Sequence, residues 1–270
     1  MAGKELGKEM ANWNDPRTTR EGFGTSQGFT GASVPRTGEV FDAGLRKHML
    51  SIYNYMTSGV LLTGVVAMLF AQSGMAAQLF VNGGILSWIV ILAPLGFVLA
   101  MSFGANRFSK PALQAMFWGF AVLMGLSLST IFLVFTGASI AATFFATAAA
   151  FAGLSLFGYT TKKNLSGWGS FLIMGVVGLL VAMIINMIWP MPGLSLAISF
   201  IGVLIFAGLT AYDTQRLKHD YLAVQQMKMT NPGAAAAFPT GKMVVLGALS
   251  LYLDFINMFQ FLLSFMGQRD

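Results

Sequence analysis

The chain has 270 residues, of which 56% are hydrophobic and only 10% are charged, and its mean hydropathy is +0.70. This composition excludes an ordinary soluble domain, in which about a quarter of the residues are charged. The absence of cysteine excludes disulfides, thiol catalysis and cysteine metal sites. The sequence therefore predicts an integral membrane protein.

The N-terminal segment, residues 1–45, differs from the rest of the chain. It is rich in Gly, Ser and Thr and carries charges of both signs. It lacks the apolar core of a cleavable signal peptide. The composition predicts a mostly disordered cytoplasmic tail.

Seven continuous apolar runs follow, and each is long enough to span a bilayer as a helix. They are rich in Leu, Ala, Met and Phe and do not alternate with polar residues, which favours helices over the strands of a barrel. We therefore expect an all-α bundle of seven transmembrane helices within residues 46–270. The expected spans are approximately 50–72, 82–103, 112–136, 138–159, 168–189, 194–215 and 243–266.

The distribution of Lys and Arg predicts how these spans are oriented. With seven passes, every basic residue except Arg269 falls on the side of the N-terminus, which the positive-inside rule assigns to the cytoplasm. The last residues then lie on the far side, unless the last segment is re-entrant and returns. The excess of Lys and Arg that orients the spans also accounts for the net charge of +6 and the pI of about 9.7. No nucleic acid or other acidic partner is required.

Two of the ten acidic residues, Asp213 and Asp254, lie inside predicted spans. An ionised aspartate near the centre of a membrane helix costs about 2.5–3.5 kcal/mol, so each should face the bundle interior, a water-filled cavity or a partner. Asp213 lies three residues before Arg216, so the alternative to an inward-facing position is that it lies at the level of the cytoplasmic headgroups. Asp254 lies roughly a dozen residues after Lys242, near mid-bilayer. Its alternative is a protonated or hydrogen-bonded packing residue.

The two aspartates can meet because the last two spans run antiparallel on either side of the connection 216–242. Two close carboxylates in a low dielectric cannot both ionise readily and titrate as a coupled unit, which would make the pair a proton switch. On ideal helices their depths differ by about 10–15 Å. A shared site therefore requires that the sixth helix continue toward Gln226, or that the seventh begin later than expected.

Several segments resemble one known family. "GLTAYDTQRLK" at 208–218 and "GALSLYLDFINMFQFLLSF" at 247–265 resemble the paired signature of the Bax inhibitor-1 (transmembrane Bax inhibitor motif) family, particularly its bacterial YccA-type members. The resemblance covers about residues 45–268. It includes "LRKHMLSIYNYMTSGVLLTG", "GLSLSTIF" and "GYTTKKNLSGWGSFLIMGVVGLLVAMIIN".

The resemblance implies a seven-helix fold around one central hydrophobic helix, with an aspartate pair that senses pH and gates a calcium leak. Asp213 in "YDTQ" and Asp254 in "LYLDFIN" match the sensor positions and would also bind permeant Ca²⁺ weakly. Arg107 in "SFGANRFSK" is the best match for the family's latching arginine, and the alternative for it is a positive-inside loop charge. The chain departs from the family pattern in its long tail and in the connection 220–242, which could cover the mouth of the site.

Two other functions stay open. YccA-type relatives modulate the membrane-bound protease FtsH, so the resemblance also implies a regulator that binds membrane proteins through its tail. Buried acids would equally serve a proton-coupled transporter, with broken helices near Pro94 or Pro190. An enzyme is not expected, because His48 and His219 lie far apart at helix ends and no "HExxH" or "GxGD" motif is present. The resemblance implies a bacterial inner membrane, with Ca²⁺ and H⁺ as candidate ions and no cofactor.

Overall fold

The computed structural model describes residues 37–81, 83–105, 107–231, 233 and 240–268. The chain divides into a unit of residues Met1–Val40 and a unit of residues Phe41–Asp270, and the second unit forms the helical bundle. Most of the expected tail, residues 1–36, lies outside the described residues. The first helix already begins at Thr37, inside the segment 1–45.

Helices make up nearly all of the described residues, because a helix satisfies the backbone hydrogen bonds of an apolar segment within that segment. Among the described helices, seven are long and apolar enough to cross a bilayer, which confirms the expected number. The elements in chain order are α1 (Thr37–Gln72), α2 (Met75–Val81), α3 (Ile85–Gly104), α4 (Lys110–Leu128), the 3₁₀ helix η1 (Ser129–Leu133), α5 (Gly137–Thr160), α6 (Ser166–Ile188), α7 (Pro192–Thr230) and α9 (Thr240–Met266).

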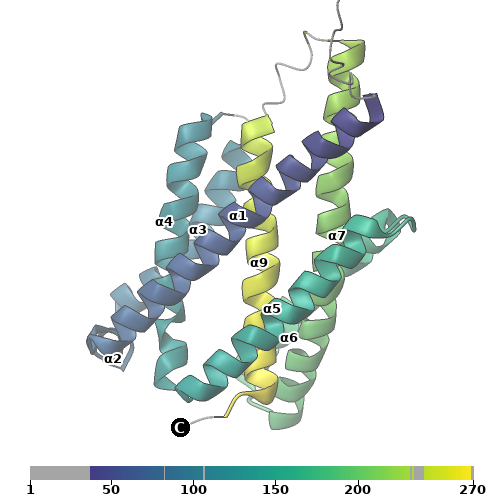
Figure 1. Ribbon diagram of the computed structural model, residues 1–270. Coiled ribbons are helices and arrows are strands. Elements are labelled where there is room, and N and C mark those ends of the chain that lie inside the picture. The colour runs from purple at the N-terminus through teal and green to yellow at the C-terminus, as the bar shows by residue number, and fades with distance from the viewer. Residues whose placement is uncertain (1–36, 82, 106, 232, 234–239, 269–270) are drawn as a thin grey trace, which may run out of the picture. The chain divides into compact units, whose positions relative to one another are not determined.

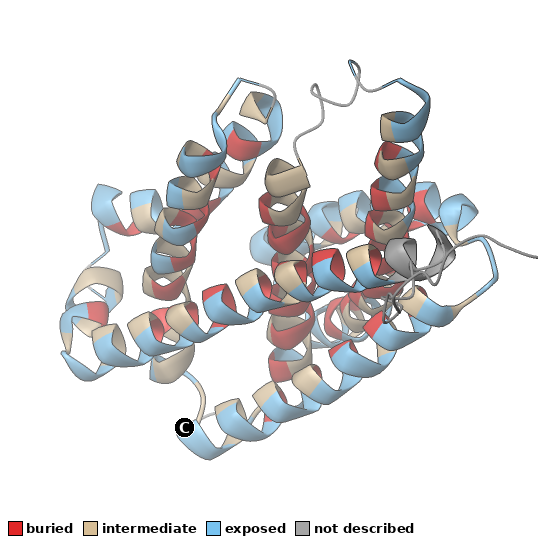
Figure 2. Ribbon diagram, turned by 45° about the horizontal axis from the view of Figure 1, so that its top comes forward, coloured by how far each residue is buried: buried red, intermediate tan, exposed pale blue. Residues whose placement is uncertain are grey.

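The central helix of the bundle is α9. In its most apolar stretch 61% of the residues are buried, against 11% in α6, and it packs against α7, α5 and α4. Figure 1 shows α9 in the middle of the bundle, and Figure 2 shows buried residues along most of its length. Its Tyr252 hydroxyl shares a hydrogen bond of 2.7 Å with the Thr63 hydroxyl of α1. This arrangement agrees with the central hydrophobic helix that the resemblance implies.

Helix α7 is much longer than its expected span, 194–215. It continues to Thr230, so it is about 58 Å long at 1.5 Å per residue, whereas the hydrocarbon core of a bilayer is about 30 Å thick. The added length packs on the bundle, because Tyr221 stacks on His48 of α1 with ring centroids 4.5 Å apart. His48 is thus buried within a helix instead of lying at a helix end. Of the two alternatives for a shared site, continuation of the sixth helix past Arg216 is correct, because the seventh begins at Thr240, which is no later than expected.

Helix ends that carry Lys and Arg meet at one end of the bundle, here called the basic end. Lys218 of α7 donates a hydrogen bond of 2.8 Å to the carbonyl of Tyr159, in the last turn of α5. At the opposite end, the Thr136 N–H donates to the Gln268 carbonyl at 3.1 Å, so α9 runs without a break from the basic end to the opposite end of the bundle and does not turn back. The side of the membrane that the basic end faces stays a prediction. Its described basic residues are Arg46, Lys47, Arg107, Lys110, Lys162, Lys163, Arg216, Lys218, Lys228 and Lys242.

Candidate functional site

Asp213 lies on the buried face of α7 and connects this helix to α9. Its Oδ1 is 3.3 Å from Nη1 of Arg216, one turn further along α7. Its Oδ2 accepts a hydrogen bond from the Ser250 hydroxyl of α9. Nη2 of Arg216 donates to the same Ser250 oxygen at 3.2 Å. Asp213, Arg216 and Ser250 therefore form an interhelical bridge between α7 and α9.

Asp254 lies one helical turn from Ser250 on α9, about 6 Å along the helix axis. It is near the middle of the helix and buried. Within the described part of the chain, no donor is in hydrogen-bonding distance of its Oδ2. Burying a carboxylate oxygen without a donor costs free energy, so packing stability does not explain an aspartate at this position.

The structure brings both predicted aspartates to one cavity of about 490 Å³ between α6, α7 and α9. The expected difference in depth of about 10–15 Å shrinks to about one helical turn, or about 6 Å. Because α7 continues past Arg216, Asp213 lies deep enough in the bundle to meet Ser250, only one turn from Asp254. The polar residues that line the cavity are Tyr212, Asp213, Arg216, Ser250, Asp254, Asn257, Gln260 and Ser264.

Five of these polar residues belong to α9, and all of them except Asp254 escaped the prediction from sequence. They occupy positions 250, 254, 257, 260 and 264, so they are three or four residues apart and share one face of the helix. This spacing was visible in "GALSLYLDFINMFQFLLSF", where polar residues recur with the helical period in an apolar segment. Polar residues that face inward in a membrane helix typically mark an ion or substrate pathway.

A second cavity, of about 660 Å³, adjoins the aspartate cavity toward the end opposite the basic end. The two linings share Met183, Phe261 and Ser264, so the cavities are neighbours. Polar residues continue in the second cavity, where the Asn186 side-chain amide donates to the Ser195 hydroxyl at 2.8 Å. Polar groups therefore follow one route from the interhelical bridge toward the far end of the bundle.

The predicted latch, Arg107, lies elsewhere. It is exposed in the turn between α3 and α4, where its backbone N–H donates to the Gly104 carbonyl at 2.9 Å, and it is not among the residues that line the aspartate cavity. The structure does not bring Arg107 to Asp213 or Asp254. The arginine that contacts Asp213 is Arg216. The spacing of three residues between Asp213 and Arg216 was the available signal, but in the sequence it supported only the alternative of headgroup placement for Asp213.

The cavity offers few charged ligands for a cation. The described residues contain no group of three or more His, Cys, Asp or Glu side chains that could hold a metal ion. Ca²⁺ prefers six to eight oxygen ligands, and Arg216 already occupies one oxygen of Asp213. A cation in this cavity would keep much of its hydration shell and bind weakly.

Comparison with known proteins establishes the family. Residues 45–270 match the model of the family described as inhibitor of apoptosis-promoting Bax1. The chain belongs to the Bax inhibitor-1 family. A similar protein of Caulobacter vibrioides, named only as uncharacterized, is 48% identical over 84% of this chain and 90% of its own length. The inner membrane protein YbhL of Escherichia coli K12 is 40% identical over 84% of this chain and 94% of its own length.

A third relative, the uncharacterized protein RP147 of Rickettsia prowazekii, is 39% identical over 86% of this chain and 93% of its own length. Membership of the Bax inhibitor-1 family confirms the resemblance found in the sequence. The family match includes α7 and α9 in full, and with them both aspartates and the interhelical bridge.

Proposed function

We propose that this member of the Bax inhibitor-1 family is a pH-sensitive leak channel for calcium or other cations, gated by Asp213 and Asp254, in a bacterial inner membrane. One observation carries the proposal. Both aspartates line a cavity that adjoins a second polar cavity toward the opposite end of the bundle. The location rests on the relative YbhL, which is named an inner membrane protein.

The interhelical bridge is the proposed gate. With Asp213 ionised, Arg216 and Ser250 hold α7 against α9 between the cavity and the basic end. A proton on Asp213 removes its attraction for Arg216 and weakens the acceptor that Ser250 uses. The two helices can then separate at the bridge and admit a hydrated cation.

The charges around Asp213 give the sign of the pH response. Arg216 attracts Asp213, whereas Asp254 in the same cavity and Asp220 further along α7 repel it. Acidification neutralises Asp213 and releases Arg216, so cation flux should rise as pH falls. Asp254 is the proposed contact for the passing cation, because it lines the cavity one helical turn beyond the interhelical bridge.

The test is Ca²⁺ flux into proteoliposomes that contain the purified full chain, scanned from about pH 8 down to about pH 5, the range in which buried carboxylates titrate. Asp213→Asn and Asp254→Asn should both flatten the pH dependence. Asp220→Asn is the matched comparison, because Asp220 is exposed on the same helix and does not line the cavity. It should keep the pH dependence and move it only slightly toward lower pH, since one weak repulsion on Asp213 is lost. If the wild-type protein passes no ion at any pH, the channel function is wrong.

A second candidate function is regulation of another membrane protein, such as the protease FtsH. It is favoured by the length of α7, which at about 58 Å exceeds the hydrocarbon thickness and extends at the basic end. A pure regulator would show no flux in liposomes that contain no other protein. A transporter, the third candidate, would instead show saturable uptake of a substrate coupled to protons.

A further inference from the structure

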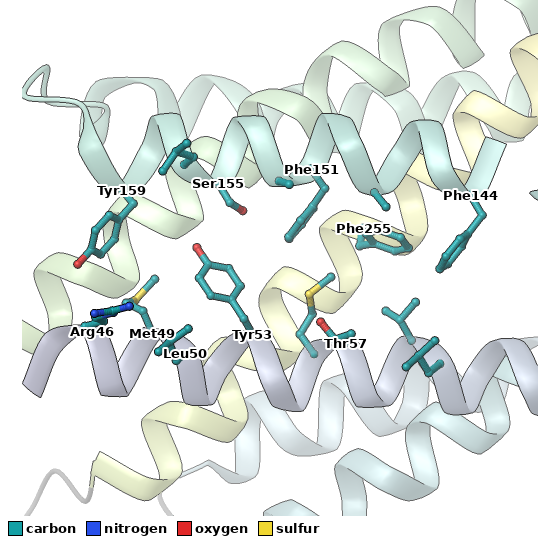
Figure 3. Close-up of a pocket in the computed structure, with 16 residues that line it drawn as sticks. Arg46, Met49, Leu50, Tyr53, Thr57, Phe144, Phe151, Ser155, Tyr159 and Phe255 are labelled. Carbon is teal, nitrogen blue, oxygen red and sulfur yellow. The ribbon is translucent and has the colours of Figure 1, made fainter. Parts of the chain in front are cut away.

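A separate groove lies between α1 and α5, with Phe255 of α9 in its lining (Figure 3). It consists of two cavities of about 630 Å³ and 500 Å³ whose linings share Val60, Phe144 and Phe255, so that they adjoin. Each is in the range of about 300–1,000 Å³ that is usual for ligand sites. We call the two cavities together the α1–α5 groove.

The α1–α5 groove is long and mostly apolar. On α1 its lining extends from Arg46 to Gln72, which corresponds to about 39 Å of helix and exceeds the thickness of the hydrocarbon core. Between these ends the lining consists mainly of Leu, Val, Ala, Phe and Met side chains. The flexible Met49 and Met56 can adapt to a chain of irregular shape. The groove therefore has the length and chemistry of a site for a lipid chain.

Polar and cationic groups gather where the α1–α5 groove reaches the basic end. Arg46, Tyr53, Ser155 and Tyr159 line it there, and no acidic side chain is among the lining residues that the structure describes. Figure 3 shows Arg46 facing Tyr159 across the groove, and the Tyr53 hydroxyl directed toward Ser155. Lys218 of α7 is not part of the lining but lies close by, with its Nζ 5.1 Å from the centre of the Tyr159 ring.

We propose that the α1–α5 groove binds one anionic phospholipid from the leaflet at the basic end. The charges identify the occupant, because a guanidinium at the end of a long apolar groove matches an anionic headgroup attached to an acyl chain. Arg46 binds the phosphate, the tyrosine hydroxyls donate to its oxygens, and the chain lies between α1 and α5 against Phe255. Helices on both sides and α9 behind distinguish this site from lipid that only covers the outer surface.

The first experiment measures lipid retention by native mass spectrometry. The full-length protein is reconstituted in vesicles of equal parts phosphatidylglycerol and phosphatidylethanolamine, extracted and washed with detergent. The wild type should retain phosphatidylglycerol in preference to phosphatidylethanolamine. Arg46→Ala should reduce this preference about fivefold, and Arg46→Lys should keep part of it. Lys162→Ala is the matched control, because Lys162 is an exposed cation at the same end and outside the groove.

A second pair of variants tests the part of the groove that would hold the acyl chain, without changing any charge. Ala152 lines the groove, whereas Ala150 is exposed on the opposite face of α5. Ala152→Trp should displace retained lipid of both headgroup classes, and Ala150→Trp should not. The proposal is overturned if Arg46→Ala keeps the headgroup preference of the wild type. It is equally overturned if the two tryptophan variants retain the same amount of lipid.

Discussion

Asp213 and Asp254 are the same type of residue, lie on packed neighbouring helices and line one cavity, yet their surroundings differ. Both carboxylate oxygens of Asp213 have a partner, Arg216 for one and Ser250 for the other. Within the described residues, no donor reaches Oδ2 of Asp254. Asp213 therefore connects two helices, whereas Asp254 lines the same cavity and keeps a buried oxygen without a hydrogen-bond partner. Both aspartates are buried, so burial does not distinguish their roles. Their hydrogen-bond and ion-pair partners do.

The strongest test of this difference is the folding stability of Asp213→Ala. The variant should lose about 1–3 kcal/mol, because Arg216 and Ser250 lose a shared buried acceptor. The half-exposed Arg216 keeps the loss below that of a fully buried ion pair. Unfolding in detergent micelles measures it, with Asp254→Ala as the comparison. Equal losses in the two variants would remove the distinction between the aspartates.

The next test concerns which arginine is the latch. Arg216→Gln should raise Ca²⁺ flux in proteoliposomes at about pH 8 by about tenfold and abolish most of its pH dependence, because a charge-assisted bond across the gate is lost. Arg107→Gln should leave both unchanged, since Arg107 is exposed in the turn between α3 and α4. A larger effect at Arg107 would assign the latch to the turn between α3 and α4, as the resemblance first suggested.

A smaller effect is expected from Ser250→Ala, which removes the link to α9 but leaves the ion pair of Asp213 and Arg216 in place. Ser250 makes two hydrogen bonds across the gate, each worth about 1 kcal/mol, and their loss is partly offset because Asp213 and Arg216 stay paired. Flux at high pH should therefore rise about fivefold and lose much of its pH dependence, since a proton on Asp213 then weakens no hydrogen bond to α9. The same flux assay measures both quantities. Ser264→Ala is the control, because Ser264 lines the same cavity nearer the opposite end of α9. An equal rise in this control would mean that Ser250 has no special part in the gate.

The smallest effect is expected for the stability of Asp254→Asn. Because no described donor depends on Oδ2 of Asp254, the amide should change the free energy of unfolding by less than about 1 kcal/mol. Unfolding in detergent micelles checks this value. A loss above about 2 kcal/mol would show that Asp254 is a hydrogen-bonded packing residue, the alternative that the sequence left open.

Much of the architecture was predictable, because each membrane helix must supply a long apolar run and any acid inside such a run is conspicuous. The seven helices, Asp213 and Asp254 all follow from this rule. The interhelical bridge does not, because the contact of Ser250 with Asp213 depends on the register between α7 and α9. No local pattern in either segment sets that register.

The length of α7 was also missed, although the sequence carried a signal for it. Leu217, Tyr221 and Val224 are buried and recur at intervals of four and three residues, as expected for a helix that continues to pack on the bundle. The intervening Lys218 and the exposed Asp220 lower the local hydropathy. A search for apolar runs therefore ends near Arg216, where the helix itself does not.

The uninterrupted length of α7 connects its outer end mechanically to the contact between Asp213 and Ser250. Thr230, at its outer end, is about 26 Å along the helix axis from Asp213, and the helix between them has no break. A lateral force at that outer end would be transmitted along α7 and would strain its contact with Ser250. A force on the end of α7 and a proton on Asp213 would thus both act on the contact between α7 and α9, the first mechanically and the second through charge.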